Sequence, residues 1–173
     1  EIPRPTNEFA TPRLDNEVIW SPNSQFLSLL VDDQAGDFDI MVYEVANRSS
    51  ENFTETVYRE NAVSWSLDSK RVVFATDQCD SVINRCPPDQ QYWNISIMDV
   101  TTRVQRIVSH GIERFQLGDN WNDNSLCATR LSPTQAYVVY EIYCPSEGIN
   151  SYRDVFVSAI NHRETFRLTD FAD

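Results

Sequence analysis

A five-residue motif occurs three times along this chain of 173 residues, and each copy precedes an apolar run typical of a β-strand. The copies are Trp20-Ser21-Pro22-Asn23-Ser24, Trp65-Ser66-Leu67-Asp68-Ser69 and Leu131-Ser132-Pro133-Thr134-Gln135. Farther along each repeat, an acidic or amide residue leads a second apolar stretch, at Asp39, Asn94 and Asp154. Repeats of roughly 40 to 50 residues that are rich in strand signals indicate the blades of a β-propeller.

Aligned on the first residue of the motif, each repeat predicts four short strands. We expect them at 17–20, 25–31, 38–45 and 54–58, then at 62–65, 70–76, 92–99 and 103–108, and finally at 127–131, 136–143, 152–159 and 164–168. These segments are rich in β-branched and aromatic residues and are separated by Asn, Asp, Ser and Pro. No stretch has apolar residues at a period of 3.6, so little helix is expected. The predicted fold class is all-β, with three four-stranded antiparallel blades.

The repeats divide the chain into four parts. Residues 1–16 are expected to be a linker and the outer strand of a preceding blade, because Pro12-Arg13-Leu14-Asp15 resembles Arg167-Leu168-Thr169-Asp170. The three blades are then 17–60, 61–125 and 126–173, and the second carries insertions at 77–91 and 109–125. Propellers close with about four to eight blades. Three blades therefore predict part of a larger propeller, a dimer that closes the ring, or a partner chain that supplies the remainder.

The motif, its following strands and the closing Arg167-Leu168-Thr169 resemble the TolB-type propeller repeat, and they are similar to blades in the propeller domains of prolyl oligopeptidases. The resemblance covers roughly residues 12–170. Leu131 departs from it by replacing the motif Trp, and the Trp-Asp dipeptide of WD-type repeats is absent. What the resemblance implies is a propeller fold; it is nearly silent on function.

The repeated Trp is predicted to fill the wedge between adjacent blades, where an aromatic side chain of this size buries on the order of 200 Å². The Ser and Asn or Asp beside it are predicted to cap backbone groups of a turn. Asp39, Asn94 and Asp154 occupy one aligned position, which favours a recurring structural hydrogen bond.

The net charge of −12 argues against nucleic acid and anionic lipid as partners, since both need a basic surface. No apolar stretch approaches 20 residues, so no membrane insertion of this segment is expected. The chain starts at Glu1 without a signal peptide, and we expect it to have been trimmed.

The four cysteines form two local pairs, Cys79 with Cys86 and Cys127 with Cys144. Four cysteines allow three connectivities, and free buried thiols remain an alternative to disulfide bonds. Disulfide bonds would place the protein outside the cytoplasm, in the periplasm, at the cell surface or secreted. Sequons at Asn47, Asn52 and Asn94 leave glycosylation open.

The sequence offers little for catalysis. His110 and His162 are the only histidines, and there is no Gly-x-Ser-x-Gly elbow, so we expect no enzyme activity and no cofactor. No metal site is predicted, although Asp32, Asp33 and Asp37 could supply oxygens to calcium.

Aromatic residues in polar surroundings mark the predicted binding site. Tyr92, Trp93 and Trp121, with Asp119 and Asp123, lie in or beside the two insertions. The predicted function is a non-catalytic, extracytoplasmic module for protein–protein interaction or ligand sensing, with its partner unidentified. Two alternatives stay open: the substrate-gating propeller of a larger peptidase or hydrolase, and the extracellular sensor domain of a membrane receptor or kinase.

Overall fold

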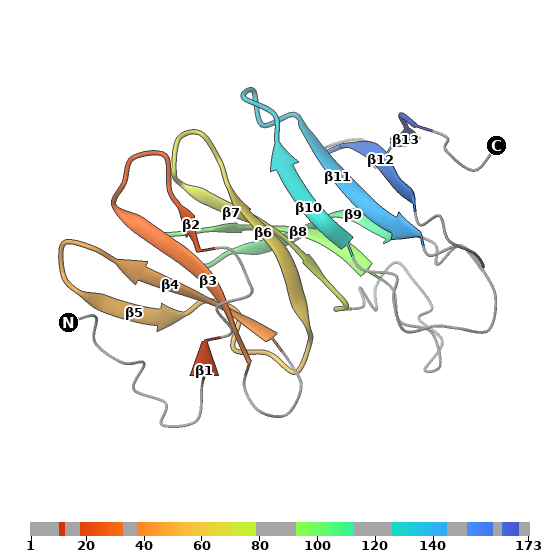
Figure 1. Ribbon diagram of the computed structural model, residues 1–173. Coiled ribbons are helices and arrows are strands. Elements are labelled where there is room, and N and C mark those ends of the chain that lie inside the picture. The colour runs from red at the N-terminus through yellow and green to blue at the C-terminus, as the bar shows by residue number, and fades with distance from the viewer. Residues whose placement is uncertain are drawn as a thin grey trace.

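Three antiparallel sheets stand side by side in chain order, like the blades of a fan (Figure 1). The computed structural model describes residues 11–12, 18–32, 38–78, 93–112, 126–144, 152–160 and 164–169. These residues contain strands and turns but no helix, and so no helix that could cross a membrane. The predicted all-β class and the blade architecture are confirmed.

The first sheet, blade 1, consists of β1 (Thr11–Pro12), β2 (Ile19–Trp20), β3 (Phe26–Asp32), β4 (Phe38–Glu44) and β5 (Ser49–Asn52). Its order is β1-β3-β4-β5, and β2 pairs with β3 as well. Because β4 occupies the other edge of β3, β1 and β2 share one edge and together form an interrupted inner strand. Thr11 and Pro12, expected in a preceding blade, thus pair with this sheet.

The outer strand of blade 1 differs from the prediction of 54–58. The chain reverses within Val45–Arg48, where Arg48 has φ 52°, so β5 begins already at Ser49. A short turn after β4 brings the polar residues of Ser49–Asn52 into register with it, and polarity hid this strand from the sequence pattern.

The second and third sheets follow the predicted order. Blade 2 consists of β6 (Glu60–Trp65), β7 (Arg71–Thr76), β8 (Trp93–Asp99) and β9 (Gln105–Ile112). Blade 3 consists of β10 (Leu126–Leu131), β11 (Tyr137–Cys144), β12 (Tyr152–Ala159) and β13 (Thr165–Arg167). In both sheets consecutive strands are hydrogen-bonded neighbours. All eight predicted strands are present, with β9 reaching beyond its predicted end at 108.

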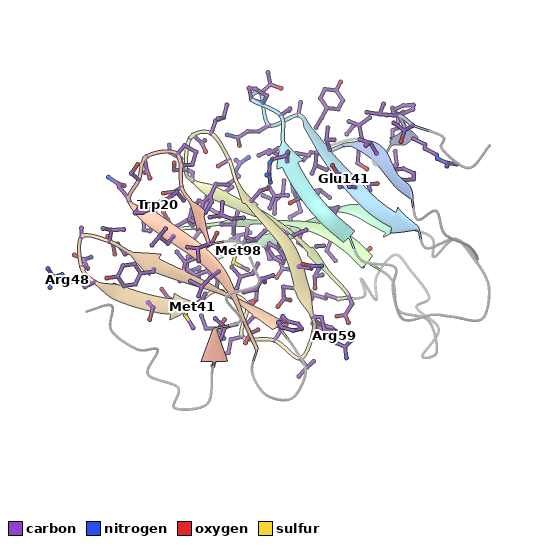
Figure 2. All side chains as sticks on the ribbon, in the orientation of Figure 1. Trp20, Met41, Arg48, Arg59, Met98 and Glu141 are labelled. Atoms are coloured by element: carbon purple, nitrogen blue, oxygen red, sulfur yellow. The ribbon has the colours of Figure 1, made fainter. Side chains whose placement is uncertain are left out.

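The core lies between the blades, in two separate apolar clusters. The cluster between blades 1 and 2 contains Leu30, Ile40, Val42, Phe53, Val63, Trp65, Val72, Phe74 and Met98, the last of which Figure 2 labels near the centre of the molecule. The cluster between blades 2 and 3 contains Val73, Ala75, Ile95, Ile97, Val108, Val138, Tyr140, Phe156 and Ile160. Successive residues of β7 alternate between the clusters, because side chains of a strand point to opposite faces. Blade 2 is therefore buried on both faces.

Candidate functional site

The repeated motif forms the same turn in all three blades, between the inner strand and the next. The backbone N–H of the motif Ser donates to a carbonyl five residues on, at 2.9 Å in each blade (Ser21 to Phe26, Ser66 to Arg71, Ser132 to Tyr137). The fifth motif residue has a left-handed backbone in every copy, with φ 59° at Ser24, 59° at Ser69 and 57° at Gln135. The sequence repeat is thus a repeat of backbone conformation.

Side chains within the turn cap backbone groups, as predicted. The Ser66 hydroxyl accepts from the Arg71 N–H at 2.9 Å and donates to Asp68 Oδ1 at 2.6 Å. Asp68 Oδ1 also accepts from the Lys70 N–H at 3.1 Å. These hydrogen bonds, chiefly that from Ser66, hold the pKa of Asp68 below its usual range.

The turns of neighbouring blades are also hydrogen-bonded to each other. The Asn23 N–H of blade 1 donates to Ser69 Oγ of blade 2 at 3.0 Å. In the next pair, Arg71 donates to Gln135 Oε1 at 2.6 Å, and Gln135 Nε2 donates to Asp68 Oδ2 at 2.8 Å. In both cases the fifth motif residue of the later blade contacts the turn of the earlier one. The motif therefore links blades as well as strands.

Trp65 makes the central contact between blades 1 and 2. Its side chain is 8% exposed, and its ring stacks on that of Phe26 with centroids 5.8 Å apart and planes 13° from parallel. The indole Nε1 donates to Ser28 Oγ at 2.9 Å and to the Ile19 carbonyl at 3.2 Å. The predicted wedge role is confirmed for this Trp, and its buried donor is satisfied.

Blades 2 and 3 meet through a different but matched set of residues. Leu131 takes the Trp65 position, and the aligned residues of blade 2 are Arg71 in place of Phe26 and Val73 in place of Ser28. Leu131 packs against the apolar cluster between blades 2 and 3. Its side chain has no hydrogen-bond donor, so it does not need an acceptor such as the Ser28 hydroxyl, which Val73 replaces. The departure of the third copy from the motif is thus accompanied by corresponding changes in blade 2.

Two outward faces remain, one at each end of the arc. On blade 1, Trp20 occupies the Trp65 position but is 54% exposed; on blade 3, Tyr137 occupies the Phe26 position and is 50% exposed. The wedge role is therefore absent for Trp20 within the described part of the chain. Figure 2 labels Trp20 on blade 1 and Glu141 on blade 3, toward opposite ends of the molecule.

Each outward face has apolar neighbours that the strand register brings to the same side. We call the first the leading face, made of Val18, Trp20, Leu27, Leu29 and Tyr43. We call the second the trailing face, made of Tyr137, Val139, Val157, Phe166 and Leu168. On the leading face the residues farther from the motif turn, Val31 and Met41, are buried, so its exposed part is the Trp20 end.

Two buried carboxylates, Asp39 of blade 1 and Glu60 of blade 2, are both hydrogen-bonded to threonines of the segment that joins β5 to β6. Asp39 is 8% exposed and accepts from Asn52 Nδ2 at 2.7 Å and Thr54 Oγ1 at 3.2 Å. Thr54 Oγ1 also accepts from the Ile40 N–H at 2.9 Å. A parallel bond joins the Val155 N–H to Thr169 Oγ1 at 2.8 Å in blade 3. Asp39 therefore has the structural role that its recurrence predicted.

Glu60 is the less completely hydrogen-bonded member of the pair. It is 3% exposed, and its Oε1 accepts from Thr56 Oγ1 and Thr76 Oγ1, each at 3.3 Å. Its Oε2 is the one buried side-chain polar atom without a hydrogen-bond partner in the described part of the chain. The pKa of Glu60 is raised to about 8, chiefly by burial and also by the negative charge of Asp39, while hydrogen bonds from nearby threonines oppose the rise. Sequence reasoning missed this pair, whose only signal is an acid beginning the strand Glu60–Trp65.

Most of the predicted site residues lie outside the described residues: Tyr92, Trp121, Asp119, Asp123, Cys79, Cys86, Asp33 and Asp37. For the four remaining predicted site residues, the structure gives only the position of the backbone. Trp93 pairs with Ile112, Asp32 with Phe38 and Cys144 with Tyr152, while Cys127 falls at a register shift between Leu126 and Ala128. The proposed hot spot and disulfide bonds stay predictions. Within the described ranges, no group of three His, Cys, Asp or Glu side chains could hold a metal.

No protein-family model matches the sequence, and no curated protein sequence matches it. Solved structures do match. TolB from Agrobacterium tumefaciens matches with a TM-score of 0.61 and 14% identity, over 92% of this chain and 50% of that one. A prolyl endopeptidase matches with a TM-score of 0.56 and 15% identity, over 88% of this chain and 21% of that one. Tricorn protease matches with a TM-score of 0.56 and 12% identity, over 90% of this chain and 13% of that one.

The chain spans half the length of that TolB and a smaller share of each protease. At these identities the likeness concerns the fold. It agrees with the three fanned sheets and with the turn that recurs in each of them. The chain has the fold of a TolB-like β-propeller, of which the structure describes three blades.

Proposed function

We propose that this chain is a non-catalytic propeller module that binds other proteins outside the cytoplasm. The observation that carries the proposal is the exposure of Trp20 and Tyr137, whose equivalents in the interior, Trp65 and Phe26, stack in a blade-to-blade contact. Exposed apolar patches built around aromatic residues are typical of protein–protein interfaces. The two local cysteine pairs support an oxidising compartment.

The insertions 77–91 and 109–125 are the second part of the proposed binding surface. Loops added to a rigid scaffold are where binding residues are concentrated, and Trp121 is the tryptophan of the second insertion. We propose that Trp121, with Asp119 and Asp123, forms a hot spot for a protein partner.

Photo-crosslinking in the source cells tests this proposal. A benzoylphenylalanine at Asn122 should form an adduct with a discrete protein partner, and the Trp121→Ala exchange should remove that adduct. The same photo-crosslinker at Val104, an exposed residue of blade 2, serves as the control and should form no such adduct. Equal adducts at both positions, or an adduct indifferent to Trp121→Ala, would rule out the hot spot.

A second candidate is the propeller domain of a larger peptidase. The structural likeness to a prolyl endopeptidase and to tricorn protease favours it, since this chain covers only 21% and 13% of those proteins. Sequencing the gene beyond the codons for these residues decides between the candidates. A following hydrolase domain with a Gly-x-Ser-x-Gly elbow, and peptidase activity of the full product, would replace the first proposal with this one.

A further inference from the structure

We propose that Asn47 is the residue of this chain that carries an N-linked glycan, whereas the asparagines of the other two sequons serve the fold. The inference rests on the proposed function in one respect, since such a glycan is added only to a chain that leaves the cytoplasm. The sequons begin at Asn47, Asn52 and Asn94, and each has the Asn-x-Ser/Thr pattern of an N-glycosylation acceptor. The structure places these three asparagines in different surroundings.

Asn47 lies at the exposed tip of blade 1, in the turn Val45–Arg48 that joins β4 to β5. Every residue of this turn is exposed, and so is Ser49, the hydroxyl residue of the sequon. Figure 2 labels the neighbouring Arg48 at the outer margin of the molecule. The Asn47 side chain donates an exposed hydrogen bond from Nδ2 to Glu44 Oε2 at 2.8 Å. Water can replace this surface bond, so a sugar on Nδ2 would extend into solvent without disturbing the packing.

The matching turn of blade 2 shows that a neighbouring blade leaves this position open. Thr102 aligns with Asn47 in the turn between β8 and β9, and its hydroxyl donates to Asp99 Oδ1 at 3.1 Å. Arg103, the next residue, lies over the Phe53 ring of blade 1, with its guanidinium carbon 3.2 Å from the ring centroid. Thr102 is nevertheless exposed. Asn47 would therefore stay accessible with or without another blade packed against that side of blade 1.

Asn52 is engaged by the buried acid of blade 1. It is half-buried, and Nδ2, the atom that would bear the sugar, donates to Asp39 Oδ2 at 2.7 Å. Its Oδ1 accepts from the N–H groups of Thr54 at 3.2 Å and Glu55 at 3.0 Å. The Thr54 hydroxyl, which completes this sequon, is itself buried and donates to Asp39 Oδ1 at 3.2 Å. A glycan would draw Nδ2 away from Asp39, whose buried charge needs its donors.

Asn94 is enclosed in β8 of blade 2. It is 2% exposed, and its Nδ2 donates to the Gln78 carbonyl at 2.6 Å. Ser96, which completes this sequon, is fully buried and accepts from Gln105 Nε2 at 3.1 Å. A sugar attached here has no space in the folded blade, because protein interiors are close-packed. A chain glycosylated at Asn94 should therefore fail to form blade 2.

The modification joins the Asn47 amide to a lipid-pyrophosphate-linked oligosaccharide, which the oligosaccharyltransferase of the secretory pathway supplies. Nδ2 forms a bond to the anomeric carbon and loses one proton. The bond from that carbon to the pyrophosphate oxygen breaks, and the lipid pyrophosphate leaves with its electron pair. The transfer precedes folding, so the fold acts afterwards by deciding which glycosylated chains can reach the native state.

Secretion from cultured eukaryotic cells tests the assignment. The chain is expressed behind a secretory signal, and the secreted protein is treated with a peptide N-glycosidase in heavy-oxygen water, which labels each former glycan site. Mass spectrometry should find the label at Asn47 and none at Asn52 or Asn94. Asn47→Gln and Ser49→Ala should each abolish it, while Ser49→Thr keeps the hydroxyl and should retain it. Circular dichroism of the deglycosylated proteins confirms that the variants are folded.

The matching turn provides a second control. Thr102→Asn combined with Val104→Ser builds a sequon at two exposed positions of blade 2, and this variant should gain a second glycan. A secreted protein without a glycan at Asn47, or with one at Asn52 or Asn94, would overturn the proposal. A wild-type chain that is retained in the cell would overturn it as well, because the glycosylated chain must fold. The photo-crosslinking test of a protein partner does not depend on this result.

Discussion

At the scale of single residues, the tryptophan that begins the repeated motif lies in two different environments, one in blade 1 and one in blade 2. Trp65 is buried, stacked and doubly hydrogen-bonded, whereas Trp20 is half exposed at the end of the arc. The sequence motif is the same around both. What differs is that Phe26 of the neighbouring blade stacks on the Trp65 ring, and no local pattern contains that contact.

Trp65→Ala should lower the free energy of unfolding by about 3–5 kcal/mol, because it removes a large buried side chain and leaves a cavity. Trp20→Ala should lower it by less than about 1 kcal/mol. Urea denaturation followed by circular dichroism gives both values, at a concentration where the chain is monomeric. Equal losses from the two exchanges would contradict the assignment of Trp65 as the wedge.

Glu60 should make the stability depend on pH. Its pKa is raised from 4.5 to about 8 in the folded protein, so the folded state holds the proton more tightly than the unfolded chain. Stability from this group is complete below pH 4.5 and is lost as the pH rises toward 8, at up to about 1.4 kcal/mol per pH unit. Glu60→Gln should remove this slope, and urea midpoints from pH 5 to 8 measure it.

The exposed Glu55 provides the matched control, because Glu55→Gln changes the same chemical group outside the buried pair. The prediction concerns the difference between each variant and the wild type, so the titration of other carboxylates cancels. If Glu60→Gln keeps the full wild-type slope, Glu60 is not the buried acid that this structure implies.

At the scale of elements, most strands were predictable because apolar β-branched runs alternate with turn residues. Arg71–Thr76 illustrates this, since both of its faces are buried and the run is almost continuously apolar. Ser49–Asn52 was not predictable, because this outer strand is polar and is held by its pairing with β4. The turn was predictable because its capping side chains are local in sequence.

Ser66→Ala tests the turn as an element. The hydroxyl of Ser66 is fully buried and accepts from the Arg71 N–H, so its removal leaves that donor without its partner and should cost about 1–3 kcal/mol. Ser132→Ala makes the same change in blade 3, where the Ser is only partly buried and water can replace the hydroxyl. Its cost should be smaller. Denaturation of the two variants compares them, and a larger loss at Ser132 would contradict the capping role.

The candidate site was less predictable than the fold. The sequence indicated that a motif Trp fills a wedge, but which aromatic ring it would meet depends on Phe26 of another blade, 39 positions before Trp65. The Asp39 and Glu60 pair likewise forms only when two blades pack together. Contacts between repeats are set by the arrangement of whole sheets, so they have no short sequence signature.

At the scale of the whole molecule, blade 2 connects the two apolar clusters through β7. Phe74 belongs to the cluster with blade 1, while its neighbours Val73 and Ala75 belong to the cluster with blade 3. In repeat proteins stability is the sum of intrinsic and nearest-neighbour terms, so a shared strand couples the two interfaces. The described blades should therefore unfold together and not one by one.

Phe74→Ala and Val138→Ala test this coupling from its two sides. Each removes a fully buried side chain from a different cluster, at a cost of about 3–5 kcal/mol for the Phe and a smaller one for the Val. If unfolding is cooperative, each exchange lowers hydrogen-exchange protection by the same free energy in β4 of blade 1 and β12 of blade 3. Loss of protection only in blade 1 for Phe74→Ala, and only in blade 3 for Val138→Ala, would show that the blades open independently. In that case the two outward faces could each lose their shape without disturbing the other.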